Sequence, residues 1–303
     1  MTEPIECWPA AAFPTVPRPR VLCVDDEPMV LEGLRLRLRE RYEVLTASSA
    51  AAGLELLHRD PSIAVLVTDL RMPRTDGISF LRLARSIAPD TSRILLSGQL
   101  DVGNGVDSVN DGQVCACLLK PCPPDVLLAA VNAACSQSRL HRAQRLFAEQ
   151  CERDRAKPIA ETLRQAALAF GWRYAAMVLQ DDRGERRGFW GCGLPADLYP
   201  PGQPLPPALA PCANGGGTVR LRANDAPALE GLPPGHPPVK ELLGLALPAM
   251  THCSGWLYFA DPQAQPTATA DDVLAAAVLA GACSQACHRA AAHAMEALPE
   301  TAE

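Results

Sequence analysis

Hydrophobic and polar positions between residues 20 and 145 follow two alternating patterns. Five short apolar runs have the composition of buried strands, and each is followed by a stretch with apolar residues at helical spacing. Val30, Leu31 and Leu34 show that spacing after Pro28, which stands where a first helical turn begins. The five expected strands are RVLCVD, YEVLTA, IAVLVTD, SRILLSG and VCACLLK.

Strands that alternate with helices predict a doubly wound α/β domain with a five-stranded parallel sheet. Parallel neighbours need crossover connections of about a dozen residues, and helices usually supply them. Ligands of such sheets bind outside the carboxyl ends of the strands. Asp25, Asp26, Asp69, Ser97 and Lys120 all lie at the end of a predicted strand or directly after it, so we expect them at one edge of the sheet.

The pattern changes near residue 155, where short turns separate the apolar runs. A helix over PIAETLRQAALAF ends at Gly171, and a final helix extends from Asp271 to about Met295. Strands joined in this way predict an α+β domain with an antiparallel sheet. The Pro- and Gly-rich stretch at 194–238 is either a ligand lid or a partly disordered insertion. The expected strands are RYAAMVLQD, RRGFWGC, GTVRLR, LLGLALPAM and SGWLYFAD.

These patterns divide the chain of 303 residues into five segments. The last helix of the first domain continues until Pro158 interrupts it, so a helical linker is expected to join the two domains. The expected segments are a disordered Pro-rich tail at 1–18, a parallel α/β domain at 19–138, the helical linker at 139–157, an α+β domain at 158–295 and a C-terminal tail at 296–303.

Charge and composition argue against several classes of protein. The net charge is −6 and no basic tract is present, so the electrostatic footprint of a nucleic-acid-binding protein is missing. The N-terminal stretch lacks the apolar core of a signal peptide, and the apolar run at 273–283 is shorter than the roughly 20 residues that span a membrane. We therefore expect a cytoplasmic protein with no membrane or nucleic-acid partner, in which most of the 12 cysteines are reduced.

Three acidic residues crowd the end of the first expected strand, in the segment VLCVDDEP. Two uncompensated carboxylates about 4 Å apart repel by roughly 4 kcal/mol at an effective dielectric constant near 20. A hard cation such as Mg²⁺ offsets that repulsion, because it prefers oxygen ligands. A solvated strand end followed by an acidic helix start is the alternative explanation of Asp25, Asp26 and Glu27.

Four ordered motifs of the first domain together resemble the receiver domain of two-component response regulators. They are the Asp25–Asp26 pair, LVTDLRMPRTDGI around Asp69, LLSG at the fourth strand and LLKP at the fifth. The resemblance implies a fold of the flavodoxin or CheY type and a place in a phosphorelay. It also implies a sensor histidine kinase or a phosphotransfer protein as the partner.

The resemblance assigns a chemical role to the acidic residues. Asp69 would be the phosphoacceptor, a carboxylate nucleophile that takes a phosphoryl group from a phosphohistidine. A Mg²⁺ ion would neutralise charge during the transfer. Its ligands would be Asp25, Asp26, Asp69 and the backbone carbonyl of Arg71.

Lys120 and Ser97 complete the site that the resemblance implies. Lys120 would pair with the new phosphoryl oxygens, aimed by a cis bond to Pro121, and Ser97 would supply a hydroxyl donor and draw its loop inward. The expected switch positions are Ser97 and Cys117. Cys117 departs from the family, which usually has an aromatic residue three positions before the lysine. The switch is therefore expected to act through the helix-four region or the last helix.

Residues from about 155 to 295 resemble a GAF domain. The resemblance is carried by LLGLALPAMTHCSGWLYFADP and TATADDVLAAAVLAGACSQACHRA, which give two apolar strands and an Asp-capped helix. It implies a sensory or docking module that binds a small molecule or forms a homodimer through the linker and its own helices. A fold resemblance does not assign the ligand.

Cysteine and histidine recur in the same segment. His252–Cys253 and Cys283 with Cys287–His288 are candidates for a metal site, for redox sensing or for a chromophore anchor. Buried, unreactive thiols are the favoured interpretation, because zinc sites commonly use shorter paired spacings and this helix is rich in Ala and Leu.

Three functions are open to the second domain. The leading hypothesis is a response regulator whose output acts by contact and not by catalysis. The sequence contains no GGDEF, EAL or P-loop motif, so we expect no enzyme activity beyond the phosphorylation of Asp69. An unrecognised catalytic domain that turns over a nucleotide and a transcriptional output are the alternatives.

Overall fold

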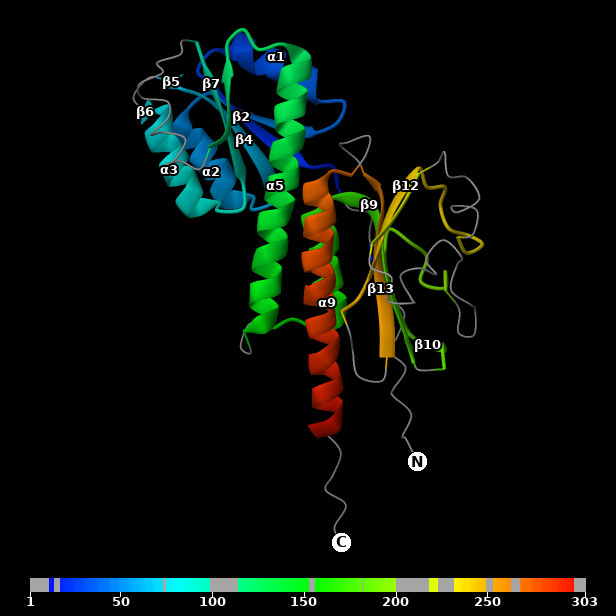
Figure 1. The fold of residues 1–303 in the computed structure, drawn as a ribbon. Helices are drawn as coiled ribbons and strands as arrows, with labels where there is room; N and C mark the ends of the chain where they lie inside the picture. The colour runs from blue at the N-terminus through cyan, green and yellow to red at the C-terminus, as the bar shows by residue number, and fades with distance from the viewer. Residues whose placement is uncertain are drawn as a thin grey trace. The chain divides into compact units, whose positions relative to one another are not determined.

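In the computed structural model the chain forms two compact units (Figure 1). The first unit is Arg18–His141, and the second combines Met1–Pro17, Arg142–Pro262 and Pro266–Glu303. The structure describes residues 11–13, 17–72, 75–98, 114–152, 156–181, 183–199, 218–222, 232–248, 253–262 and 268–296.

Five parallel strands form the sheet of the first unit. They are β2 (Arg20–Val24), β3 (Glu43–Ala47), β4 (Ile63–Asp69), β7 (Ser92–Ser97) and β8 (Val114–Leu119). The order across the sheet is β3-β2-β4-β7-β8, and every neighbouring pair is parallel. All residues of β4 are buried, as expected of a central strand that is covered on both faces. The predicted parallel sheet is confirmed.

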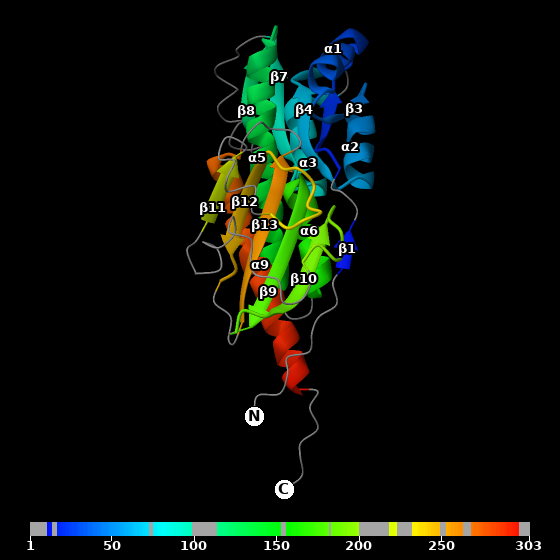
Figure 2. The same cartoon turned by 90° about the vertical axis from the view of Figure 1, so that its right-hand side faces the viewer.

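Helices cover both faces of this sheet, as Figure 2 also shows. They are α1 (Pro28–Leu38), α2 (Ala50–Arg59), α3 (Gly77–Ile87) and α5 (Pro124–Cys151). Leu34 of α1 and Val131 of α5 pack in one apolar cluster with Val65 and Val67 of β4. Leu57 of α2 and Phe80 of α3 pack in the other, which contains the intervening strand residues. The fold is therefore doubly wound.

A pair of two-residue strands separates β4 from α3. They are β5 (Arg71–Met72) and β6 (Thr75–Asp76), which pair antiparallel. The stretch LDVGNGVDSVNDG, expected as a helix between the fourth and fifth strands, lies outside the described residues. The described part of the first unit thus matches the predicted order of elements.

The second unit has an antiparallel sheet, as the sequence predicts. Its strands are β9 (Trp172–Asp181), β10 (Arg186–Cys192), β11 (Thr218–Arg222), β12 (Glu241–Ala246) and β13 (Cys253–Pro262). They lie in the order β10-β9-β13-β12-β11. The GTVRLR segment forms β11 inside the Pro- and Gly-rich stretch, where it pairs with β12. The helix-strand-helix order of this unit is α+β.

Part of the predicted N-terminal tail belongs to this second sheet. Residues Ala11–Phe13 form strand β1, which pairs in parallel with Trp190–Cys192 of β10. The prediction of a disordered tail at 1–18 is therefore wrong for these three residues. The edge of β10 offers unpaired backbone groups, and any extended segment can satisfy them without a distinctive side-chain pattern.

Helices α6 (Ile159–Phe170) and α9 (Ala270–Glu296) pack on the second sheet. The ring of Phe170 lies 5.0 Å from that of Trp172 and 4.1 Å from that of Phe259. Trp256, Tyr258 and other alternate strand residues form a separate apolar cluster. By length and composition Ala270–Ala291 could cross a membrane, but 56% of it is buried, as in the core helix of a folded domain.

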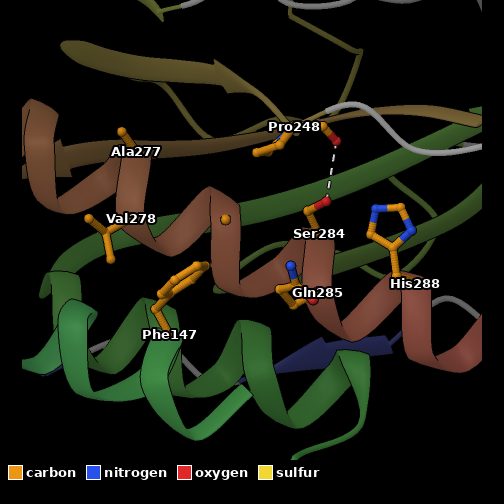
Figure 3. A pocket seen from close by; sticks show the side chains of 8 residues that line it. Phe147, Pro248, Ala277, Val278, Ser284, Gln285 and His288 are labelled. Carbon is orange, nitrogen blue, oxygen red and sulfur yellow. Dashed lines mark hydrogen bonds between the residues drawn. The ribbon is translucent and has the colours of Figure 1, made fainter. Parts of the chain in front are cut away.

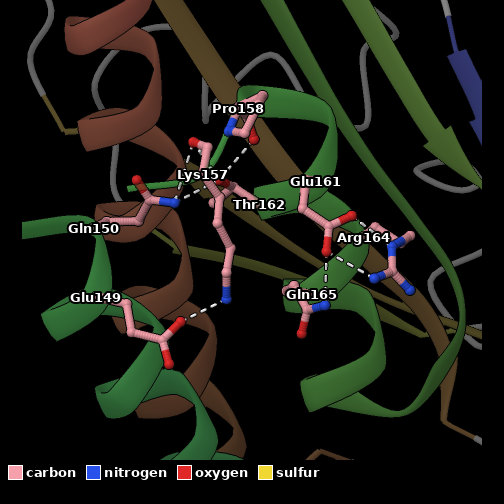
Figure 4. A network of polar contacts seen from close by, with 8 residues as sticks. All are labelled: Glu149, Gln150, Lys157, Pro158, Glu161, Thr162, Arg164 and Gln165. Atoms are coloured by element: carbon pink, nitrogen blue, oxygen red, sulfur yellow. Dashed lines mark hydrogen bonds and ion pairs between the residues drawn. The ribbon is translucent and has the colours of Figure 1, made fainter. Parts of the chain in front are cut away.

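Helix α5 continues from the first unit into the second without a break at residue 138. A polar network joins its end to α6 (Figure 4). The buried side-chain amide of Gln150 donates to Thr162 Oγ1 at 2.7 Å, and that hydroxyl lies 2.9 Å from the Pro158 carbonyl. Lys157 pairs with Glu149 at 2.5 Å. These contacts join the end of α5 to the start of α6.

Candidate functional site

One lysine joins two buried carboxylates at the carboxyl ends of the first sheet. Lys120 Nζ lies 2.7 Å from Asp25 Oδ2 and 2.8 Å from Asp69 Oδ1. Asp25 is 1% exposed and Asp69 is 8% exposed. Along the chain Lys120 is 95 positions from Asp25 and 51 positions from Asp69, and only the parallel sheet brings the three residues together.

The strands explain how these side chains meet. Asp25 follows β2, Asp69 ends β4 and Lys120 follows β8, so all three stand where parallel strands finish. Each carboxylate is also fixed by a backbone amide two residues further on. Glu27 N donates to Asp25 Oδ1 at 2.9 Å, and Arg71 N donates to Asp69 Oδ2 at 3.0 Å. The remaining oxygen of each carboxylate is therefore directed toward Lys120.

The shared ammonium compensates only one of the two negative charges. Burial disfavours the charged form of Lys120, but hydrogen bonds and attraction to Asp25 and Asp69 outweigh it and raise the pKa of Lys120. The lysine therefore stays charged at neutral pH. With both carboxylates ionised, the three groups carry a net charge of −1, and the site favours a further cation.

The other predicted site residues differ in how far their side chains are exposed to solvent. Ser97 is buried at the end of β7, and its carbonyl accepts from Lys120 N at 2.7 Å. Asp26 is exposed directly after Asp25, and Arg71 is exposed two residues after Asp69. Cys117 lies on β8 and is exposed. The peptide bond from Lys120 to Pro121 is cis, as predicted.

The donor set fits Mg²⁺ by its chemistry, although no preformed cage is present. Among the residues that the structure describes, no group of three or more His, Cys, Asp or Glu side chains is arranged to hold a metal ion. The physical reason is that the Lys120 ammonium lies between Asp25 and Asp69 and Asp26 faces solvent. Carboxylate and carbonyl oxygens are nevertheless the ligands that Mg²⁺ prefers, and it commonly uses only one or two carboxylates.

Two residues support Asp69 in ways that the sequence did not indicate. The hydroxyl of buried Thr68 donates to the Asp69 carbonyl at 3.2 Å. Gly77, which the sequence suggests only as part of a turn and helix cap, starts α3 against the backbone of Asp69. A Cβ at Gly77 would lie 2.6 Å from Asp69 O and 2.8 Å from Leu70 O. The signal was the DG pair after Asp69, but its contact partner depends on tertiary structure.

Two cysteines of the second unit, Cys283 and Cys287, are unreactive thiols in this structure. Cys283 and Cys287 are buried in α9, and burial raises the pKa of both thiols, that of Cys283 to about 12. They are therefore protonated at neutral pH and poorly nucleophilic. His252 lies outside the described residues, so its predicted role with Cys253 has no structural description.

A half-buried histidine lies against the second sheet. His236 Nδ1 lies 2.7 Å from the Pro237 carbonyl and Nε2 lies 3.0 Å from the Tyr258 hydroxyl. A carbonyl only accepts, so Nδ1 carries the proton and Nε2 accepts from Tyr258. Burial lowers the pKa of His236, while the Pro237 carbonyl and Asp261 oppose that shift. Protonation of Nε2 would abolish its bond from Tyr258 unless the hydroxyl rotated.

Acid is expected to destabilise the second unit through His236. The pKa of His236 in the folded unit lies below the ordinary value of 6.5. Between the two pKa values the unfolded chain therefore binds a proton at this histidine and the folded unit does not. The stabilisation is complete above pH 6.5 and is lost as the pH falls toward the folded pKa, by at most about 1.4 kcal/mol per pH unit. Urea unfolding of wild type and of His236→Gln above and below that pH measures the effect. Equal pH dependence in the two proteins would contradict it.

Comparison with known proteins places the first unit in a family. Residues 21–132 match the family described as Response regulator receiver domain. The hydrogenase transcriptional regulatory protein HoxA of Cupriavidus necator is 39% identical over 126 residues, which are 40% of this chain and 26% of that protein. The transcriptional regulatory protein GlrR of Escherichia coli is 35% identical over 119 residues, 39% of this chain and 26% of that protein.

Solved structures are also similar to part of the chain. A response regulator receiver domain protein from Clostridium thermocellum is 33% identical, with a TM-score of 0.39, and the match covers 40% of this chain and 98% of that one. The chain spans about a quarter of the length of the curated relatives HoxA and GlrR.

The first unit is therefore a CheY-like α/β domain. Its residues 21–132 belong to the response regulator receiver domain family. The matched region ends within α5, so the family says nothing about the second unit.

Proposed function

We propose that Asp69 accepts a phosphoryl group from a phosphohistidine of a partner kinase or phosphotransfer protein. The observation that carries the proposal is the pair of contacts from Lys120 Nζ to the buried carboxylates of Asp25 and Asp69. A nucleophilic carboxylate beside a fixed ammonium can hold the product of such a transfer. The membership of residues 21–132 in the receiver family supports the same role.

The transfer forms one bond and breaks one bond. A carboxylate oxygen of Asp69 attacks phosphorus, and the bond from phosphorus to the histidine nitrogen breaks, leaving that nitrogen with the electron pair. Lys120 then pairs with the phosphoryl oxygens in place of the carboxylate. The Ser97 hydroxyl, at the neighbouring strand end, would donate to the same group. Lys120 and Ser97 stabilise the charge of the phosphoryl group and exchange no proton with Asp69 during the attack.

Mg²⁺ would be held by Asp25, Asp26, Asp69 and the backbone carbonyl of Arg71. When bound, it supplies positive charge against which an anionic carboxylate can approach an anionic phosphoryl group. The net charge of −1 on Asp25, Asp69 and Lys120 favours such an ion. The exposed position of Asp26 leaves its carboxylate accessible from solvent.

The new contacts are strong enough to drive a conformational switch. A hydrogen bond to a charged group contributes about 1.5 to 3 kcal/mol, so Ser97 and Lys120 together offer roughly 3 to 6 kcal/mol. A shift from 1:99 to 99:1 between two states takes about 5.5 kcal/mol. Because Cys117 lacks the aromatic ring that the family usually moves, we assign transmission to α5, which continues into the second unit.

We propose a GAF-like sensory or docking role for the second unit, acting by contact and not by catalysis. Its antiparallel sheet with α6 and α9 agrees with the helix-strand-helix order of the GAF-like prediction. A small molecule that binds this unit remains part of the proposal. A catalytic output that turns over a nucleotide is the weaker alternative.

Transcriptional control is the second candidate function. HoxA and GlrR are transcriptional regulatory proteins, but their similarity covers only 40% and 39% of this chain. The acidic net charge argues against direct contact with DNA. A gel-shift experiment on a pool of DNA fragments distinguishes the two, since retention of DNA by the phosphorylated chain would favour the transcriptional output.

Incubation of the protein with acetyl phosphate and Mg²⁺ tests the proposed function. The intact mass is expected to rise by one phosphoryl group per chain, and peptide mapping should locate it in the segment that contains Asp69. Chelation of Mg²⁺ should prevent the gain, because Lys120 alone compensates one of the two buried carboxylates. A chain that gains no mass, or gains it at another residue, contradicts the proposal.

A further inference from the structure

The two sides of the second sheet are protected in different ways. Strand β11 carries Arg220 and Arg222, and charged side chains are a common means by which natural sheets keep other strands from pairing with an edge. Residues 188–192 of β10 are buried and include no charged side chain. Three of them pair instead with β1, which lies beside β10 in Figure 2. The chain therefore covers this uncharged edge with its own N-terminal segment.

The pairing of β1 with β10 is short. The two strands are parallel, and the registered pairs are Ala11 with Trp190, Ala12 with Gly191 and Phe13 with Cys192. Pro9 and Pro14 have no backbone N–H to donate, so between them only residues 10–13 can donate to a neighbouring strand. Release of β1 would break three residue pairs and leave the antiparallel pairing of β10 with β9 intact. The edge of β10 can therefore exchange one short segment for another.

The covered part of β10 specifies the chemistry of a segment that can replace β1. Trp190 is 4% exposed and Cys192 is 3% exposed, and a charged side chain placed against such buried apolar groups is costly. A Cβ at Gly191 would lie 3.0 Å from Phe189 Cζ and 3.1 Å from Leu194 Cβ, so the space beside Gly191 is already filled. A replacing segment therefore needs uncharged residues and a small residue opposite Gly191.

We propose that the outer edge of β10 is a docking site for an extended, uncharged segment of a partner protein, and that β1 covers this site in the resting chain. An added strand gains affinity from main-chain hydrogen bonds and specificity from its side chains. Phe13 is separated by residues 14–19 from Arg20, where β2 begins. A released β1 stays tethered and competes with the partner. The site rests on the docking role proposed for the second unit and names the surface and the class of partner.

A hollow of about 500 Å³ is a competing place for an apolar segment in this unit (Figure 3). Its lining combines α9 with Phe147 of α5 and with Pro248, which follows β12. A Cβ at Gly281 would lie 3.1 Å from Phe147 Cε2, and the Ser284 hydroxyl donates to the Pro248 carbonyl at 3.2 Å. Backbone groups inside helices are already hydrogen-bonded, so this hollow does not select an extended segment as the β10 edge does. Ala277 is exposed in its lining and provides a variant that distinguishes the two places.

A fluorescent peptide with the sequence of residues 8–16 tests the site in the full-length protein. Ala11→Pro and Ala12→Pro, made together, remove two successive N–H groups, of which one faces β10 because the direction of these groups alternates along a strand. This proline variant is expected to release β1 and to bind the peptide at least about tenfold more tightly than wild type, as when the edge is free in at most a tenth of wild-type chains. Thr2→Pro with Glu3→Pro is the matched control, since it adds the same residues outside β1. Fluorescence anisotropy measures the dissociation constants, and circular dichroism and thermal unfolding verify that every variant is folded.

A second measurement needs no substitution. When unlabelled peptide saturates the wild-type protein, the backbone amides of β1 are expected to exchange faster with deuterated solvent, because the peptide displaces the strand. Hydrogen exchange followed by mass spectrometry measures the rates. Unchanged exchange of β1 at saturation would show that the peptide binds elsewhere and would overturn the proposal.

Each outcome decides the proposal. Tighter binding of the peptide by the proline variant than by wild type and the control supports it. Equal binding by all three proteins overturns it, and so does a failure of all three to bind. A peptide that itself carries both prolines and binds as tightly as the original also overturns it. Loss of binding when Ala277→Glu is added to the proline variant places the peptide in the hollow and contradicts the β10 site. If the proline variant binds the peptide while acetyl phosphate adds no mass, the proposed phosphorylation of Asp69 fails and the docking site stands.

Discussion

Asparagine in place of Asp69 is expected to leave the protein with no detectable phosphoryl uptake from acetyl phosphate. The amide is uncharged and its oxygen is a poor nucleophile, so the bond to phosphorus cannot form at a useful rate. Asparagine is close in size to aspartate, and its oxygen can still accept from Arg71 N, which lies 3.0 Å from the carboxylate. The fold should therefore survive, and the loss should be chemical. Intact mass after incubation with Mg²⁺ and acetyl phosphate measures it.

Asp125→Asn is the matched control for this substitution. Asp125 lies in the first turn of α5 in the same unit, and its side chain is exposed. The control removes the same charge away from the site and should keep the uptake of the wild type. Equal labelling of Asp69→Asn and wild type would show that another residue accepts the phosphoryl group.

Alanine in place of Gly77 is expected to lower the free energy of unfolding by about 1 to 3 kcal/mol, the usual cost of an added methyl group in a tightly packed position. The new Cβ would lie 2.6 Å from Asp69 O and 2.8 Å from Leu70 O. Both contacts are with backbone, so no flexible side chain can give way. Displacement of Asp69 should also slow phosphoryl uptake. Urea unfolding and the rate of mass gain measure the two effects.

Gly33→Ala provides a control of the opposite sign. Gly33 lies inside α1, and a Cβ there would meet no atom within 4 Å. Because glycine in a helix is less favourable than alanine by roughly 0.5 to 1 kcal/mol, this substitution should stabilise the protein by about that amount. A similar change in stability for the two variants would mean that the close approach at Gly77 does not matter.

Local pattern was sufficient for most of the architecture. Apolar runs such as IAVLVTD predicted β4 with its full extent, Ile63–Asp69, and PIAETLRQAALAF predicted α6 up to Gly171. These elements are fixed by residues near each other in the chain. A strand or a helix with a buried face has apolar residues at a regular spacing in the sequence. The order of the elements then restricts the topology.

The sequence suggested which residues form the candidate site but not how they are arranged. Motif order identified Asp25, Asp69, Ser97 and Lys120, and the parallel sheet confirmed that their strand ends lie together. No local signal indicated that Lys120 would contact both carboxylates, or that Gly77 would press on the backbone of Asp69. Those contacts join residues distant in the chain, and only the packed fold sets their distances.

By itself the sequence determined an acidic chain with a parallel α/β domain and an antiparallel α+β domain, since hydrophobic period and turn residues act over short range. Only the tertiary structure decided that Ala11–Phe13 completes the second sheet and that Arg289 ties α9 to the end of α5. It also decided that Phe147 and Gly281 frame a hollow. Backbone pairing at a sheet edge and the fit between two helices depend on the whole fold, and no short segment encodes them.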